Sequence, residues 1–325
     1  MDQQLTVIMY HYIRELPYTR YPEIKALLTS EFKEQLAYLT KHYTFVPIED
    51  CINALQNNYD LPLNACLLTF DDGYIDHFTT VFPILKKKKI QGCFFPPAKA
   101  ILSREVLDVN KIHFFLASAF NCLDQLINDI YSTLDKYRSK YQLKSNSHYY
   151  SKLAVKGLFD PAEVIFIKRL LQVELAEDVR KLISDELFQK YVTKDEESFS
   201  RELYMNLEQI KCMRRNGMHI GSHGFNHFWL DKLSEEMQEL EIDKSLEFLQ
   251  MVNAPTENWV ICYPYGAYNE SLIKILKKKG CAMGFTSEMK ITNFSKENAY
   301  TLERLDTNYF PKLENSDPLI WEKKN

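Results

Sequence analysis

The chain has 325 residues, of which 46% are hydrophobic, and a formal net charge of -4 at pH 7. It is long enough to bury a large core in one elaborated domain, or in one domain with a sizeable insertion. The negative charge argues against nucleic acid as the main partner. No apolar run is long enough to predict a transmembrane segment.

The N-terminal stretch MDQQLTVIMYHYIRELP lacks the basic start and the apolar run of a secretory signal peptide. The seven cysteines are scattered along the chain and form no CxxC pair. We therefore expect a cytoplasmic protein with reduced thiols, without disulfides or a cysteine-bound metal.

Up to residue 97, short apolar runs alternate with amphipathic stretches. Strands are predicted at 5–10, 43–48, 65–70 and 91–97, and helices at 30–42, 49–56 and 77–89, the last interrupted near Pro83. This order is typical of a parallel sheet with helices outside it. His77, at the start of its helix, is expected at the surface.

The alternation stops near residue 103, and residues 103–205 read as mainly helical and charged. One long amphipathic stretch covers 110–137, and Asp160 and Pro161 are typical of another helix start. A segment of this size can form a small subdomain. We therefore predict one α/β domain from residues 1–102 and 206–325, interrupted by a helical insertion at 103–205.

The alternation of helices and strands resumes after residue 205. Helices are predicted at 206–217, 233–251 and 270–280, and strands at 218–223, 259–266, 281–287 and 300–306. The second half thus continues the sheet of the first half.

Two adjacent acids, Asp71 and Asp72, follow the buried strand 65–70 and precede Gly73. In parallel α/β sheets, functional sites gather at the carboxyl ends of strands. Because neighbouring residues of a strand point in different directions, one aspartate could bind a metal while the other faces a substrate. An ordinary acidic turn with an Asp-Gly corner explains this short motif equally well.

His223 and His227 are four residues apart and directly follow a predicted strand. If a helical turn begins there, both imidazoles lie on one face and can bind one metal ion. Two histidines and one aspartate form a common catalytic divalent-metal set, and a second aspartate can then act as general base. The alternative is a pair of polar surface histidines.

A third loop, CYPYGAYN at 262–269, also ends an apolar run. Pro264 and Gly266 shape a tight turn, where a backbone N–H could face an oxyanion. An ordinary strand-to-helix turn is the alternative. Trp229, just after the histidine pair, could stack on a sugar ring or pack in the core.

Together, TFDDGY, SHGFNH and YPYG occur in the order and setting typical of the polysaccharide deacetylase family, the NodB-homology carbohydrate esterases. VIMYHYI near the start and LERLDTN near the end resemble segments that flank this domain in many members. The resemblance covers about residues 5–100 and 206–310 and leaves out the helical insertion.

The resemblance implies a distorted (β/α) barrel with fewer strands than the full eight-fold barrel. It implies a divalent metal, usually zinc, held by Asp72, His223 and His227, with Asp71 as general base. The backbone N–H of Tyr265 would stabilise the oxyanion while an N-acetyl group is hydrolysed from an amino sugar. A cation beside Asp72 would relieve the repulsion between the two aspartates.

The chain departs from the family pattern at two positions. Many members carry an arginine where this chain has Cys262, so Arg304 is the candidate to orient Asp71. Many also have a late histidine that protonates the leaving amine, but no histidine follows His227 here. His11 is the candidate acid, with a structural histidine as its alternative. Asp306 either orients a site residue or caps a loop.

These features predict an N-deacetylase acting on an amino sugar or a precursor of surface polysaccharide, which could be nucleotide-linked, lipid-linked or free. An amidase acting on a non-sugar C–N bond is a second reading. A non-catalytic carbohydrate-binding protein is a third. The helical insertion could cover the site, select the substrate or form a homo-oligomer.

Overall fold

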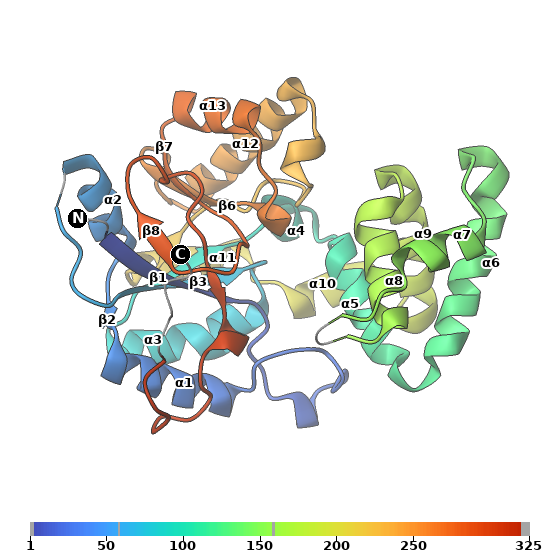
Figure 1. Cartoon of the computed structure of the whole chain (residues 1–325), viewed down its shortest axis with the longest axis horizontal. Coiled ribbons are helices and arrows are strands. Elements are labelled where there is room, and N and C mark those ends of the chain that lie inside the picture. Colours follow the sequence, from blue (N-terminus) through green and yellow to red (C-terminus); the bar gives the residue numbers. More distant parts are fainter. Residues whose placement is uncertain (1–2, 58, 158–159, 320–325) are drawn as a thin grey trace. The chain divides into compact units, whose positions relative to one another are not determined.

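The computed structural model describes residues 3–57, 59–157 and 160–319, and it divides into two compact units. The first unit comprises the described residues up to Arg14, from Ala26 to Arg104 and from Arg201 onward, and the second comprises Glu15–Lys25 and Glu105–Ser200. Figure 1 shows the strands in the first unit and a group of helices in the second. Nothing in the sequence predicts that Glu15–Lys25 belongs with the second unit.

The strands of the first unit follow the predicted alternation, although several are shorter than expected. They are β1 (Gln3–Tyr10), β2 (Thr44–Phe45), β3 (Ala65–Asp71), β4 (Gly92–Phe95), β5 (His219–Ile220), β6 (Trp259–Cys262), β7 (Cys281–Phe285), β8 (Thr292–Phe294) and β9 (Leu305–Asp306). The predicted strand 43–48 shrinks to β2 because Ile48 already begins a helix. β8 was not predicted, and it pairs antiparallel to β1.

Parallel pairing closes most of these strands into a ring. Five strands pair side by side in the order β9, β1, β3, β4, β5. A separate pair is formed by β6 and β7. A parallel bridge from Ser222 to Ile261 joins β5 to β6, and one from Phe285 to Leu302 leads from β7 to the segment before β9. The prediction of a distorted (β/α) barrel is therefore confirmed.

Side chains from alternate positions of the strands fill the barrel. Leu5 and Val7 of β1, Phe95 of β4 and Phe285 of β7 belong to one buried cluster, and the rings of Phe95 and Phe285 meet edge to face. Because residues two apart share one face of a strand, the series that contains Ala65 and Leu67 continues inward to Asp71. The alternation of β3 therefore carries Asp71 into the barrel interior.

Helices surround the strands of the first unit (Figure 1). They are α1 (Thr29–His42), α2 (Ile48–Asn57), α3 (Phe82–Lys88), α4 (Ala98–Ser103), α11 (Leu207–Arg215), α12 (Glu235–Met251) and α13 (Glu270–Lys278). The predicted helix 77–89 splits into a π-helical turn (His77–Val81) and α3, with Pro83 in the first turn of α3. Proline fits this position because no helical partner is needed for its missing N–H.

The expected surface position of His77 is wrong. Its side chain is fully buried, and its ring lies against the rings of Phe70, Tyr74 and Phe94. The turn that follows β3 packs against the sheet, so the first helical residues face inward. His77 Nε2 lies 2.9 Å from the carbonyl oxygen of His11.

The second unit is helical and has a core of its own. Its helices are α5 (Asp108–Ser118), α6 (Leu123–Tyr141), α7 (Asn146–Leu153), α8 (Ala162–Arg169), α9 (Glu177–Tyr191) and the first part of α10 (Glu196–Leu203). The stretch 110–137, expected as one run, breaks between α5 and α6. Leu126, Ile130, Phe166 and Ile183 are among its fully buried core residues.

Within the described part of the chain, each helix is too short or too polar to cross a lipid bilayer.

Candidate active site

The predicted site residues of the first unit converge where the barrel strands end. Asp71 is the last residue of β3, and His223 follows β5 by three residues. Tyr265 follows β6, and Arg304 precedes β9. Because the strands run parallel, their carboxyl ends meet at one rim of the barrel.

Arg304 and Asp71 form a buried ion pair at the centre of this rim. Arg304 Nη2 lies 2.8 Å from Asp71 Oδ2, and Nη1 lies 3.0 Å from Oδ1. The guanidinium also donates to the hydroxyl of Thr69 and to the carbonyl oxygen of Thr286. Burial alone would raise the pKa of Asp71, but the positive charge of Arg304 outweighs burial and lowers that pKa to about 2.

Cys262, the last residue of β6, also contacts Asp71. Its thiol donates to Asp71 Oδ2 across 3.4 Å. Burial raises the pKa of this thiol, so Cys262 is a neutral donor at neutral pH. The positive charge beside Asp71 therefore comes from Arg304, and Cys262 adds a weak hydrogen bond.

Asp72, His223 and His227 form a second buried group. Asp72 Oδ1 lies 3.5 Å from His223 Nε2 and 3.4 Å from His227 Nε2. Asp72 has φ 72° and His227 has φ 62°, in the left-handed region that non-glycine residues rarely adopt. Backbone strain at two residues of one cluster is typical of functional sites.

Hydrogen bonds and burial prepare the two histidines for a ligand. His223 Nδ1 lies 2.7 Å from the carbonyl oxygen of Cys262 and donates to it, so Nε2 is the ring nitrogen that faces Asp72. Burial alone would lower the pKa of His223, yet the surrounding acidic groups raise it, so a bound metal ion would replace a proton there. Burial lowers the pKa of His227, which favours its neutral form. Neutral imidazoles are the form that binds metals.

The chemistry of this group fits a divalent metal ion. Asp72 Oδ1 is buried and has no hydrogen-bond donor among the described residues, and an unpaired buried carboxylate oxygen is costly. One oxygen and two imidazole nitrogens within 4.8 Å of one another could surround an ion. Asp71, His223 and Cys262 form another such group, but Arg304 already neutralises Asp71 there, which disfavours a second cation.

Comparisons with known proteins find polysaccharide deacetylases. The family model described as polysaccharide deacetylase matches residues 189–284. The Bacillus subtilis protein YxkH, which carries the polysaccharide deacetylase name, is 35% identical over 92 residues. Over these segments the chain is similar to polysaccharide deacetylases.

The matched segments are short compared with these relatives. They span 32% of the Bacillus subtilis protein and 28% of this chain. The poly-beta-1,6-N-acetyl-D-glucosamine N-deacetylase of Escherichia coli K12 is 44% identical over 59 residues, which are 18% of this chain and 9% of that protein.

Solved structures match over nearly the whole chain. The Streptococcus pyogenes deacetylase PplD, solved in complex with acetate, has a TM-score of 0.58 and 19% identity, and the match covers 97% of this chain and 95% of that one. IcaB from Ammonifex degensii has a TM-score of 0.55 and 19% identity, with coverage of 93% and 91%. At this identity the likeness shows the fold alone.

Two further residues predicted for the site lie beside this group. His11 Nε2 is 4.0 Å from Asp71 Oδ2, and its side chain is 40% exposed. The ring of Tyr265 meets that of His227 edge to face, with centroids 4.8 Å apart, and Tyr265 has φ 58°. The Tyr265 ring also stacks on that of Trp229, with centroids 4.4 Å apart and a 3° angle between the planes. The structure therefore places both residues at the rim.

Asp306 has a structural task in the loop after β9. Its Oδ1 accepts hydrogen bonds from the backbone N–H and the side-chain amide of Asn308, at 2.8 and 2.7 Å. The carboxylate thereby caps the short 3₁₀ turn Thr307–Tyr309. Of the two alternatives for Asp306, this geometry supports the loop cap.

Glu241 of α12 is a positioning residue that sequence reasoning missed. It is buried, and its carboxylate accepts the backbone N–H groups of Phe225 and Asn226 at 3.1 and 2.9 Å, as well as the Asn226 side chain. These bonds fix the loop between His223 and His227. A glutamate on an amphipathic helix carries no local signal of such a role.

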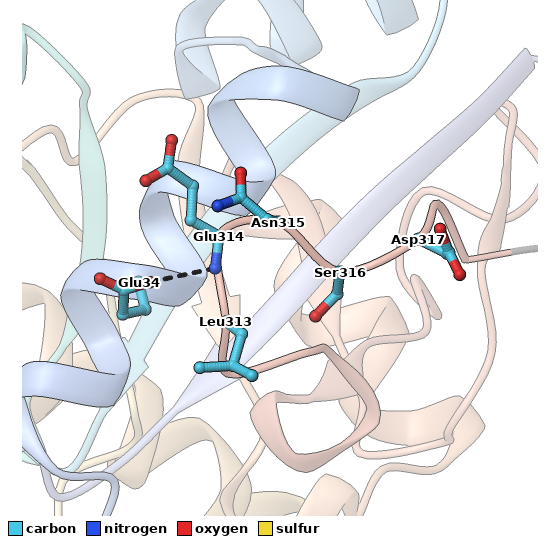
Figure 2. A pocket seen from close by; sticks show the side chains of 6 residues that line it. All are labelled: Glu34, Leu313, Glu314, Asn315, Ser316 and Asp317. Carbon is cyan, nitrogen blue, oxygen red and sulfur yellow. Dashed lines mark hydrogen bonds between the residues drawn. The ribbon is translucent and has the colours of Figure 1, made fainter.

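The pocket drawn in Figure 2 lies outside this site, between α1 and the C-terminal segment. It is lined by Glu34, Leu313, Glu314, Asn315, Ser316 and Asp317. The backbone N–H of Glu314 donates to Glu34 Oε2 at 3.1 Å. The lining offers carboxylates but no histidine or thiol, so we do not consider it a candidate active site.

Proposed function

We propose that the protein is a divalent-metal-dependent N-deacetylase that hydrolyses the acetamido group of an amino sugar in a surface polysaccharide or its precursor. The observation that carries this proposal is the unpaired buried oxygen of Asp72 facing two imidazole nitrogens, next to the Asp71–Arg304 pair. Asp72, His223 and His227 would hold the ion. The bound ion would supply Lewis acidity toward the acetyl carbonyl.

The other residues would handle the protons. Asp71, kept ionised by Arg304, would accept a proton from the water that attacks the acetyl carbon. The backbone N–H of Tyr265 would donate to the developing oxyanion. As the C–N bond breaks, His11 would give a proton to the leaving amine. The products are acetate and the free amino sugar, so one water is consumed and no redox partner is needed.

The substrate class rests on the family and on one relative. The Escherichia coli relative is named for poly-beta-1,6-N-acetyl-D-glucosamine, so a β-1,6-linked N-acetylglucosamine oligomer is the first substrate to test. Nucleotide-linked, lipid-linked and free amino sugars are the other candidates. Cytoplasmic location, and selection of substrate or oligomerisation by the helical unit, stay predictions from the sequence.

Acetate release tests the proposal. The protein, supplied with zinc, is incubated with the oligomer, free N-acetylglucosamine, a nucleotide-linked N-acetylhexosamine and a simple non-sugar acetamide. We expect acetate from at least one sugar, and a loss of about a hundredfold or more for Asp71→Asn. Cleavage of the non-sugar amide alone would favour the amidase alternative. No cleavage of any compound by the zinc-loaded protein would favour the binding protein.

A further inference from the structure

Tyr74 contacts the side of Asp72 that faces away from the histidines. Its hydroxyl donates to Asp72 Oδ2 at 2.5 Å, whereas Asp72 Oδ1 faces His223 Nε2 and His227 Nε2. Both Tyr74 and Asp72 are buried. The two oxygens of one carboxylate therefore have different surroundings: one accepts a short hydrogen bond, and the other lacks a donor among the described residues.

The ring of Tyr74 packs against two other aromatic rings. It stacks on Tyr12 with centroids 3.9 Å apart and a 20° angle between the planes, and on Tyr204 at 6.2 Å and 10°. The backbone is fixed as well, because the Met205 N–H donates to the Gly73 carbonyl at 2.9 Å. A Cβ at Gly73 would lie 2.7 Å from the Pro96 side chain, so this turn also packs closely against β4's end. The hydroxyl therefore reaches Asp72 from a rigid support.

A hydrogen bond of this kind controls how a carboxylate binds a cation. A carboxylate oxygen that already accepts a short, charge-assisted hydrogen bond is a poorer metal ligand. The other oxygen of that carboxylate then binds the metal ion alone. The phenol hydroxyl of Tyr74 is the donor in this bond, so Asp72 Oδ2 is the acceptor. One oxygen and two imidazoles then leave open positions around a small divalent ion.

We propose that Tyr74 is a positioning residue that makes Asp72 a one-oxygen metal ligand. The inference rests on the proposed function, because it requires that Asp72, His223 and His227 bind a metal ion. Without the hydroxyl, the carboxylate can rotate or offer both oxygens. Zinc and cobalt prefer a small number of ligands in fixed directions, so we expect them to bind more weakly. Calcium is larger and accepts carboxylates that bind through both oxygens, so its affinity should fall less.

The test compares Tyr74→Phe with Tyr10→Phe in the full-length protein. Tyr10 is also fully buried, and its hydroxyl donates to Gln35 Oε1 at 2.7 Å, so both variants lose one buried hydroxyl bond. Affinities for zinc and cobalt are measured by competition with a chromophoric chelator, and folding of the metal-free proteins by circular dichroism. We expect Tyr74→Phe to raise the Kd for zinc roughly ten- to a hundredfold, and Tyr10→Phe to change it less than about threefold.

The visible spectrum of the cobalt-loaded protein gives a second readout. If Asp72 gains a second bound oxygen, the coordination number rises and the absorption of cobalt weakens in Tyr74→Phe. Equal zinc affinity and an equal cobalt spectrum in folded Tyr74→Phe and wild type would overturn the inference and leave the proposed function intact. If the wild type itself binds neither ion, the proposed function fails, and the inference fails with it.

Discussion

Arg304 binds both carboxylate oxygens of Asp71, although the two residues are 233 positions apart in the chain. The pair is buried, with Arg304 only 1% exposed. Arg304 reaches Asp71 from the segment just before β9. The ion pair keeps Asp71 ionised inside the barrel, where an isolated carboxylate would favour its neutral form.

Replacing Arg304 tests whether this ion pair supports both folding and catalysis. Arg304→Ala leaves a buried charge without a partner, and we expect the free energy of unfolding to fall by about 3–5 kcal/mol, measured by urea denaturation. Arg304→Lys keeps a charge but loses the two-pronged contact, and we expect kcat to fall roughly ten- to a hundredfold.

Cys262→Ala is the matched control, because Cys262 contacts the same carboxylate through a weak donor. We expect less than about a tenfold change in its kcat. If Cys262→Ala is impaired as strongly as Arg304→Lys, Arg304 is not the residue that orients Asp71.

His11→Gln tests the assignment of the general acid. His11 lies 4.0 Å from Asp71 Oδ2 and is partly exposed, so it can approach the leaving amine. We expect kcat to fall by about a hundred- to ten-thousandfold with a sugar substrate, while zinc affinity stays within about threefold. An acetylated aniline bearing a nitro group has a weakly basic leaving amine, so its hydrolysis should lose much less. Equal losses for both substrates would rule out proton donation by His11.

Glu241→Gln tests the support of the histidine loop. In the wild type, the Glu241 carboxylate accepts hydrogen bonds from the backbone N–H groups of Phe225 and Asn226. The glutamine side chain would place its own N–H donors near these N–H groups, so one or both bonds would be lost. We expect a zinc Kd roughly tenfold higher and a loss of about 1–3 kcal/mol in the free energy of unfolding. Glu247→Gln, an exposed position on the same helix, is the control. Unchanged zinc affinity in Glu241→Gln would show that the loop holds its shape without this carboxylate.

His77 predicts how stability depends on pH. Burial lowers the pKa of His77 from 6.5 to about 4. Below about pH 6.5, His77 therefore binds a proton in the unfolded chain but stays neutral in the native protein. Stability therefore falls as the pH drops from about 6.5 toward 4. Between about pH 7.5 and about pH 5, the wild type should lose about 2 kcal/mol more than His77→Gln, measured by urea denaturation with a metal chelator present. Parallel pH profiles for the two proteins would contradict this account.

The sequence predicted the parts of the fold and site that depend on local patterns. Apolar runs marked the strands, and their last residues located Asp71, Asp72 and His223 at one rim. Contacts between distant segments were harder to predict. Arg304 was named only as a candidate substitute, and nothing near Glu241 in the sequence indicates that it holds the loop before His227. His77 was misplaced because polarity suggested the surface, whereas its turn packs against the sheet.

Metal content of the purified protein tests the central claim most directly. Elemental analysis is made on the wild type, on His223→Ala/His227→Ala and on His148→Ala, which removes an exposed histidine of α7. The account predicts about one zinc or similar divalent ion per chain in the wild type and in His148→Ala, and its loss in the double variant. Absence of bound metal from all three proteins, even after zinc is added back, would contradict a metal-dependent deacetylase.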